Sequence, residues 1–197
     1  MNAHVIDDIY DMSFLSEWEE ILLDDCPVYT TNVANPTSFP HGREGSHRLM
    51  GVDIFAREGL NRVTLLHDQA EKFFNAFEIL EEEVFKVPIY LRRIDVNLQY
   101  QGQNGTSHCD GTNHDEYTVM VMNNTKWKPE WGGQFQMLDE DGKLLEEHDY
   151  IPGRVVIFPG WIRHRGLAPL VPYVYRFTTV FRVIMEQEKV SLIHEKL

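Results

Sequence analysis

The stretch Tyr173-Val-Tyr-Arg-Phe-Thr-Thr-Val-Phe-Arg-Val-Ile184 sets the architecture that we expect for the chain. Its residues alternate in character, as in a β-strand whose successive side chains point to opposite faces. One face carries Tyr173, Tyr175, Phe177 and Phe181, and the other carries Val174, Arg176, Thr178, Val180 and Arg182. We predict that the aromatic face packs beneath a helix. The other face then looks into a barrel, where a buried arginine needs an anionic partner.

The first part of the chain predicts two helices. Asp11 or Ser13 can cap a helix that runs to about Asp24. A second helix is expected to open at Thr64, and its core-facing stripe is Leu66, Ala70, Phe73, Phe77, Leu80 and Val84. A strand is expected over 28–33. Residues 34–60 lack periodicity and predict a long loop, which is a candidate lid.

From Ile89 the period of the apolar pattern changes to two. Ile94, Val96, Leu98 and Tyr100 are expected to form the inward face of a strand, with Asp95, Asn97 and Gln99 on the other face. Further strands are expected over 116–124, 134–138, 154–158 and 173–184. This order predicts a mainly β fold of the α+β class, a sandwich or jelly roll with N-terminal helices packed on one sheet. We expect one domain over 1–197, with helical support and the lid loop in 1–88 and the jelly-roll core in 89–185.

Composition narrows the class of protein. The hydrophobic share of 43% and the charged share of 25% are ordinary for a soluble globular domain. The net charge of -13 disfavours a nucleic-acid partner. The two cysteines, Cys26 and Cys109, imply no disulfide framework. The N-terminal residues lack an apolar signal core and no apolar run is long enough to span a membrane, so we predict a cytoplasmic protein without a membrane partner.

Three residues form a candidate metal site. His108 and Asp110 are two apart, so on an extended strand their side chains share one face. His164, after Phe158-Pro-Gly-Trp-Ile-Arg, offers a second imidazole. Two histidines and one carboxylate form the facial triad of non-haem iron(II). Two of these residues also have plainer interpretations, a structural role for His164 and an Asx turn at Asp110. Likewise, Arg176 of the last strand could belong to an internal ion pair.

The order of these motifs resembles a known family. The set comprises His108-x-Asp110, Trp131-Gly-Gly133, Gly153-Arg-Val-Val-Ile-Phe-Pro-Gly160, His164 and Arg176-x-Thr178. It is similar to the iron(II)/2-oxoglutarate oxygenase superfamily, and within it to the prolyl 4-hydroxylase branch. The resemblance covers the second half of the chain well and the first half loosely. It implies a double-stranded β-helix, which is a form of jelly roll.

The resemblance also implies cofactors and roles. His108, Asp110 and His164 would hold Fe(II), and 2-oxoglutarate would pair its distal carboxylate with Arg176. Thr178 and Tyr100 would add hydrogen bonds to the cosubstrate, O2 would be the oxidant, and ascorbate is a further candidate cofactor. The chain departs from the branch at three places. Gly105 stands where an aromatic residue is usual, Tyr100 is one residue closer to His108, and the tryptophan usual near Arg182 is missing.

The leading functional hypothesis is hydroxylation of prolyl residues in a peptide or protein, with release of succinate and CO2. A peptide substrate favours an open groove, for which the loop over 35–59 and residues 124–130 would be walls. Trp127, Trp131 and Trp161 are expected near its mouth, and Arg92, Arg93 and Arg182 are expected to be available for the peptide. The alternatives are a hydroxylase of a free amino acid or other small molecule, and a non-catalytic metal-containing binding module.

Overall fold

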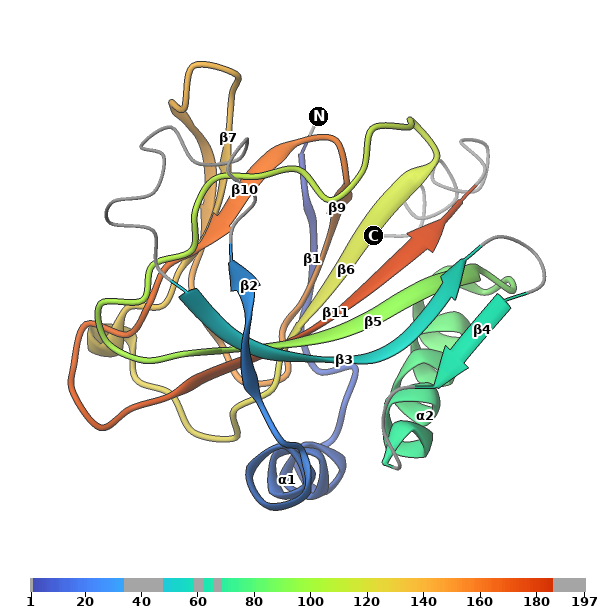
Figure 1. Ribbon diagram of the computed structural model, residues 1–197, viewed down its shortest axis with the longest axis horizontal. Coiled ribbons are helices and arrows are strands. Elements are labelled where there is room, and N and C mark those ends of the chain that lie inside the picture. The colour runs from blue at the N-terminus through green and yellow to red at the C-terminus, as the bar shows by residue number, and fades with distance from the viewer. Residues whose placement is uncertain (1, 34–47, 59–61, 66–68, 186–197) are drawn as a thin grey trace.

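Two antiparallel sheets form the body of the protein, which we describe from a computed structural model over residues 2–33, 48–58, 62–65 and 69–185. The larger sheet has the strand order β1-β9-β6-β11-β5-β3-β2, with β4 paired to β3, and the smaller sheet has the order β10-β7-β8 (Figure 1). The strands of the larger sheet are β1 (His4–Ile6), β2 (Tyr29–Val33), β3 (Arg48–Glu58), β4 (Arg62–Leu65), β5 (Tyr90–Gln99), β6 (Glu116–Met122), β9 (Val155–Pro159) and β11 (Arg176–Ile184). Those of the smaller sheet are β7 (Phe135–Leu138), β8 (Leu144–His148) and β10 (Arg163–Gly166). This is the jelly roll of the α+β class that the sequence predicts.

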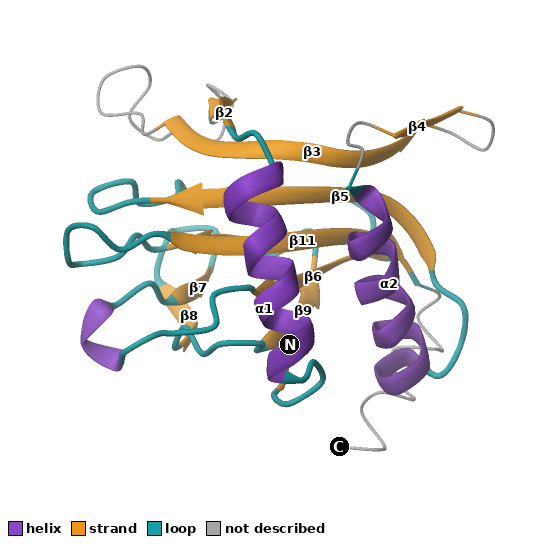
Figure 2. Ribbon diagram, turned by 90° about the horizontal axis from the view of Figure 1, so that it is seen from below, coloured by secondary structure: helices purple, strands orange, loops and turns teal. Residues whose placement is uncertain are grey.

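The helices cover the outer face of the larger sheet (Figure 2). Helix α1 (Met12–Glu20) continues as the π-helical turn η1 (Ile21–Asp25), and α2 (Ala70–Leu80) continues as η2 (Glu81–Phe85). Asp11 caps α1 by accepting a hydrogen bond from the Phe14 amide at 2.7 Å. A short 3-10 helix, η3 (Pro129–Trp131), lies in the β6–β7 connection. No helix in the described ranges is long and apolar enough to cross a membrane.

Aromatic side chains fill the layer between the helices and the sheet. The Phe181 ring of β11 lies 5.5 Å from Phe77 and 6.4 Å from Trp18, and Trp18 meets Phe73 edge-on at 5.8 Å. Phe181, Trp18 and Phe73 are fully buried. Phe177 and Phe181 therefore pack beneath the helices as predicted. Tyr173 does not, because the strand begins only at Arg176 and Tyr173 precedes it, with a φ of 63° and 98% of its surface exposed. The other face of the strand, with Arg176 and Thr178 buried, looks toward the smaller sheet.

The first part of the chain contributes more strand than predicted. The expected loop over 34–60 contains β3 over Arg48–Glu58, which pairs with both β5 and β2, whereas residues 34–47 lie outside the described part of the chain. The helix expected from Thr64 begins at Ala70, because β4 occupies Arg62–Leu65 and pairs with β3. Residues 1–88 are thus not only helical support but supply strands to the larger sheet. Tertiary pairing with β5 overrides the weak local pattern of β3.

Candidate functional site

Backbone pairing brings His108 and His164 together. The His108 amide donates to the His164 carbonyl at 3.1 Å, and the His164 amide donates back to the His108 carbonyl at 2.9 Å. The Asp110 amide donates to the Gly160 carbonyl at 2.8 Å. As a result, one ligand atom of each of His108, Asp110 and His164 lies within 4.8 Å of the others. The three residues that the sequence singles out as metal ligands therefore converge.

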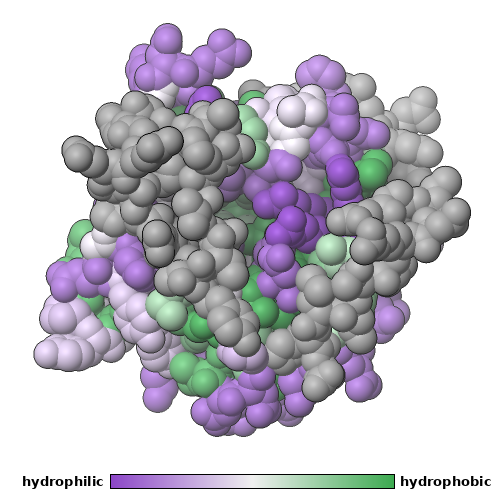
Figure 3. Space-filling model, viewed as in Figure 1, coloured by the Kyte–Doolittle hydropathy of each residue, from purple (hydrophilic) through white to green (hydrophobic). Residues whose placement is uncertain are grey.

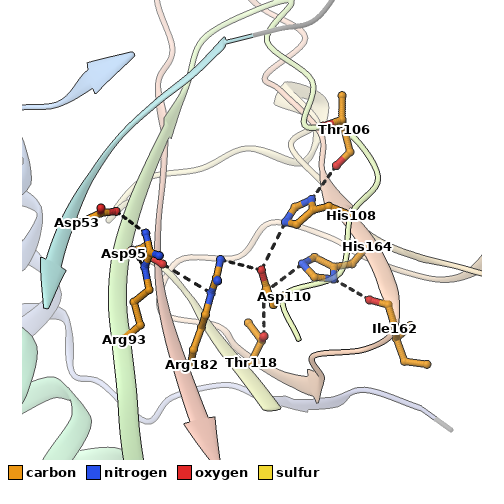
Figure 4. A network of polar contacts seen from close by, with 10 residues as sticks. All are labelled: Asp53, Arg93, Asp95, Thr106, His108, Asp110, Thr118, Ile162, His164 and Arg182. Atoms are coloured by element: carbon orange, nitrogen blue, oxygen red, sulfur yellow. Dashed lines mark hydrogen bonds and ion pairs between the residues drawn. The ribbon is translucent and has the colours of Figure 1, made fainter. Parts of the chain in front are cut away.

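Backbone carbonyls fix the orientation of both imidazoles (Figure 4). His108 Nδ1 lies 2.8 Å from the Thr106 carbonyl oxygen, and His164 Nδ1 lies 2.9 Å from the Ile162 carbonyl oxygen. Each carbonyl accepts, so the proton of the neutral ring belongs on Nδ1 and Nε2 keeps its lone pair. The two Nε2 atoms lie 3.6 and 3.3 Å from oxygens of Asp110. This donor set suits a divalent transition metal.

The carboxylate of Asp110 is buried and held at both oxygens. Thr118 Oγ1 donates to Oδ2 at 2.8 Å, and Arg182 Nη2 lies 3.0 Å from Oδ1. Burial alone would raise the pKa of Asp110, but the charges of His164 and Arg182 and two histidine hydrogen bonds hold it well below its usual value. For His108 burial has the opposite effect and lowers the pKa. The hydrogen bond to Asp110 and the negative charge of that group outweigh burial, so the pKa of His108 is raised overall.

A ladder of ion pairs continues from Asp110 across the interior face of the larger sheet (Figure 4). Arg182 Nε lies 3.7 Å from Asp95, Asp95 accepts from Arg93 Nε at 2.6 Å, and Arg93 Nη2 reaches Asp53 at 2.8 Å. Burial raises the pKa of Asp95 to about 7 despite its two arginine neighbours. Arg93 and Arg182, which were expected to be available for a peptide, are therefore already paired with acidic residues.

The second polar site of the interior is the buried side chain of Arg176, which is 1% exposed. Its Nε donates to the Gly133 carbonyl at 2.9 Å and its Nη1 donates to Gln99 Oε1 at 2.8 Å. The guanidinium lies 5.0 Å from the centre of the Tyr150 ring. Its Nη2 is buried without a hydrogen-bond partner, and no carboxylate among the described residues pairs with it. Burial without an anion lowers the pKa of Arg176 to about 10.

Close packing fixes the position of this guanidinium. Gly133 has a φ of +81°, and a Cβ there would lie 2.7 Å from the Trp127 ring. A Cβ on Gly166 would lie 3.1 Å from Arg176 Nη1. Neither position has room for a side chain without a shift of its neighbours. The unpaired Nη2 of Arg176 therefore has a fixed position, and a carboxylate is the group that a guanidinium binds best.

Comparison with known proteins agrees with this geometry. The family model described as the 2OG-Fe(II) oxygenase superfamily matches residues 96–181, which include the three convergent residues and Arg176. Over these residues the chain is similar to this superfamily. No curated protein sequence matches it significantly.

Solved structures share the fold of this chain at low sequence identity. A 2OG-Fe(II) oxygenase family oxidoreductase from Burkholderia pseudomallei has a TM-score of 0.68 at 13% identity, over 92% of this chain and 85% of the other. A prolyl hydroxylase from Trichoplax adhaerens, solved with a hypoxia inducible factor peptide fragment, has a TM-score of 0.63 at 15% identity, over 96% and 86%. The carbocyclase SnoK of nogalamycin biosynthesis has a TM-score of 0.61 at 10% identity, over 93% and 79%.

Tyr100 does not lie where the alternation pattern places it. The residue follows the end of β5 and is 42% exposed, so it lies outside the interior. The apolar residues of β5, Ile94, Val96 and Leu98, join the core beneath the helices. The polar face is the inward one, and Gln99, the register partner of Arg176, contacts the guanidinium instead. Thr178 is buried two residues along the same strand face as Arg176.

Several features of the site were not predicted: Gln99, Thr118, Tyr150 and the contact of Arg182 with Asp110. Gly133 was part of the predicted motif set, but its hydrogen bond with Arg176 was not foreseen. The position of Gln99 on the polar face of its strand was a usable signal, because a polar residue opposite a buried arginine can contact it across the strand pair. The tryptophans do not gather at one mouth. Trp127 packs on Tyr150 and Trp131 at the Arg176 end, whereas Trp161 packs on Tyr117 and His114.

Proposed function

We propose that this protein is an Fe(II)- and 2-oxoglutarate-dependent oxygenase that hydroxylates prolyl residues in a peptide or protein with O2, releasing succinate and CO2. The observation that carries the cosubstrate part is the unpartnered Nη2 of buried Arg176, in the same interior as the convergent His108, Asp110 and His164. A dicarboxylate accounts for both features, since one end can bind a metal and the other can bind a guanidinium.

His108, Asp110 and His164 would hold the metal, which supplies the oxidising chemistry once the cosubstrate and oxygen are bound. The protein itself orients the three ligand side chains. The carbonyls of Thr106 and Ile162 keep the proton of each imidazole on Nδ1, so that Nε2 is ready to ligate. Thr118 and Arg182 hold the Asp110 carboxylate ionised and in place.

Arg176 would bind the distal carboxylate of 2-oxoglutarate through Nη2, while Nε and Nη1 stay on Gly133 and Gln99. Thr178, buried on the same face, is placed to add its hydroxyl. The apolar side chains around the site, including Phe135 and Phe158 against His164, exclude water from the interior. A dry site strengthens the charge-assisted contact to Arg176.

The prolyl substrate is supported by two observations. A cavity of about 580 Å³ begins at Asp110 and lies between strands β3, β5, β6 and β11, so the candidate metal site has an approach from outside. A structural neighbour is a prolyl hydroxylase seen with a peptide fragment. A small-molecule substrate is the second candidate, because another neighbour is a carbocyclase from nogalamycin biosynthesis.

The test is succinate release from 2-oxoglutarate by the iron-loaded protein with ascorbate present, with and without a pool of prolyl peptides. Mass spectrometry of the pool should find a gain of one oxygen on proline, and a matched pool with alanine in place of proline should gain none. If the peptides stay unmodified while free proline or another amino acid drives succinate release, the small-molecule candidate replaces the prolyl one. An absence of 2-oxoglutarate turnover under all of these conditions would favour the metal-containing binding module.

A further inference from the structure

The cavity that begins at Asp110 is rich in arginine. Its lining comprises Ala56, Arg57, Arg92, Arg93, Asp110, Gly111, Thr112, Glu116, Tyr117, Thr118, Gly160, Arg182 and Val183. Strongly hydrophilic atoms collect in a hollow in the middle of this face of the molecule, over β6 and β11 (Figure 3). Arg176 and Gln99 are not among the described lining residues. The cavity is therefore distinct from the buried site proposed for 2-oxoglutarate.

Three of the four arginines already have acidic partners. Arg93 lies between Asp95 and Asp53, and Arg182 lies between Asp95 and Asp110. Arg92, at the more exposed rim, pairs with Glu116. Glu116 in turn accepts hydrogen bonds from the amides of Thr112 and Asn113, which fix its carboxylate.

Arg57 differs from the other three. No ion pair joins it to an acidic residue whose side chain the structure describes, and its Nε is buried without a hydrogen-bond partner among the described residues. Its guanidinium lies 4.9 Å from the Tyr90 ring centre and 5.6 Å from the Phe55 ring centre. The rings hold the position of the charge without neutralising it. In a chain of net charge -13, an arginine left without an acidic partner in a cavity is a feature that needs an explanation.

The cavity connects this charge with the candidate metal site, because Arg57 and Asp110 both line it. Ala56, which precedes Arg57, is the register partner of Arg93 on β5, and Arg93 is the register partner of Arg182 on β11. Arg182 in turn contacts Asp110. A substrate bound with one group near Asp110 can therefore extend past Arg182 and Arg93 to Arg57 within the same cavity.

We infer that the cavity recognises an anionic group of the primary substrate, a carboxylate, through Arg57, with Arg92 at the rim. The inference rests on the proposed function for the reaction itself, and it adds the chemical class of the substrate. The carboxylate has two sources: the side chain of a glutamate or aspartate near the oxidised residue of a peptide, or the α-carboxylate of a free amino acid. Either one supplies an acceptor that Arg57 lacks within the described structure.

Binding measurements separate these sources. The protein is loaded with Mn(II) and 2-oxoglutarate under anaerobic conditions and titrated calorimetrically with end-blocked prolyl hexapeptides. One glutamate is moved through every position other than proline, and each peptide has a glutamine counterpart. Free proline is compared with prolinamide. We expect at least one carboxylate probe to bind about tenfold more tightly than its amide partner, the effect of one charge-assisted contact.

The variants assign that preference to a residue. Arg57→Gln should reduce the carboxylate-to-amide ratio to about one, and Arg57→Lys should keep part of it because lysine retains the charge but not the fork. The matched control is Arg154→Gln, which removes an arginine paired with Asp7 outside the cavity and should keep the wild-type ratio. A thermal melt of each variant confirms that the ratio is measured on folded protein.

Three results would overturn the inference: equal affinity for every carboxylate and amide pair, binding of none of these probes, or an unchanged ratio in Arg57→Gln. The outcomes remain separable from those of the proposed function, because the titration requires no turnover. Prolyl oxidation without any charge preference removes only the role of Arg57. A charge preference without 2-oxoglutarate turnover removes the proposed reaction and keeps the anion site.

Discussion

The two faces of strand β11 carry different kinds of contact. Phe177, Phe181 and Val183 pack beneath the helices in a core of aromatic and aliphatic side chains. Arg176 and Arg182 face the interior, where one has an unpaired nitrogen and the other lies between two carboxylates. Packing is close to complete on the first face, whereas polar groups on the second are fixed in place without being fully satisfied. The difference indicates that stability and chemistry are divided between the faces of one strand.

The sharpest test of this division is removal of a candidate metal ligand. His164→Ala should abolish metal-dependent 2-oxoglutarate turnover, because two remaining ligands leave the facial set incomplete. Its circular dichroism spectrum should remain that of the wild type. The measurement is succinate release at saturating Fe(II), and His148→Ala on β8, outside the candidate metal site, is the control. Full activity in His164→Ala would remove the basis for the triad.

A substitution that leaves a cavity in the core beneath the helices should lower the stability and keep the activity. Phe181→Ala should lower the free energy of unfolding by about 3–5 kcal/mol, the usual cost of deleting a fully buried aromatic ring. Turnover per folded molecule should be kept, because Phe181 contacts Trp18 and Phe77 rather than the site. Urea unfolding checks the first statement and turnover at low temperature the second. Leu145→Ala, at a position 53% exposed, should change the stability by less than about 0.5 kcal/mol.

Replacement of Arg176 should have an effect of intermediate size on the use of 2-oxoglutarate. Arg176→Ala should raise the KM for 2-oxoglutarate by about 10- to 100-fold, which corresponds to about 1.5–3 kcal/mol for a charge-assisted contact. Arg176→Lys should raise it less, since a point charge replaces part of the fork. The measurement is the dependence of succinate release on 2-oxoglutarate concentration. An unchanged KM in Arg176→Ala would mean that the distal carboxylate binds elsewhere.

Metal affinity should depend on pH through the candidate ligands. The pKa of His108 is raised overall, so in the metal-free protein this imidazole keeps its proton to a higher pH than usual. The ion must displace that proton, and affinity should fall by about tenfold per pH unit for each imidazole still protonated below its pKa. Above the raised pKa of His108 the dependence should level off. Competition titrations with a chelator across this range measure the slope, and a flat profile down to acid pH would contradict it.

The smallest effect on activity is expected for Tyr100, which the alternation pattern wrongly assigned to the interior. Tyr100→Phe should change the KM for 2-oxoglutarate by less than about twofold, because a half-exposed hydroxyl outside the interior contributes little. Gln99→Leu should have a larger effect, since it removes the acceptor of Arg176 Nη1. The same 2-oxoglutarate titration compares the two variants. A larger effect of Tyr100→Phe than of Gln99→Leu would restore the original assignment.

The contrast between Tyr100 and Gln99 shows what sequence patterns predict. Alternation correctly grouped Ile94, Val96 and Leu98 on one face of β5, because side chains of a strand alternate whatever surrounds them. The pattern did not say which face looks inward, since a jelly roll with helices on one sheet buries both faces. The choice is visible only in the pairing of β5 with β11, where Gln99 lies opposite Arg176.

The candidate site shows the same limit. His108, Asp110 and His164 could be selected from ligand chemistry and spacing, and their convergence follows from a backbone bridge that no local pattern announces. Strand β3 was missed because its alternation is interrupted by Gly51 and by mixed charge, and its formation depends on partners distant in sequence. As a result, Arg57 was assigned to a loop, and its place in the cavity could not be foreseen.

The bridge between His108 and His164 has a consequence for folding as well as for chemistry. His164 belongs to β10 of the smaller sheet, whereas Asp110 is held by Thr118 of the larger one. An ion bound by all three would act as a cross-link between the two sheets, much as a disulfide joins distant segments. The melting temperature should therefore rise with the concentration of free metal, by the mass action of a ligand that binds only the folded chain. Metal supply would then govern the lifetime of the protein together with its activity.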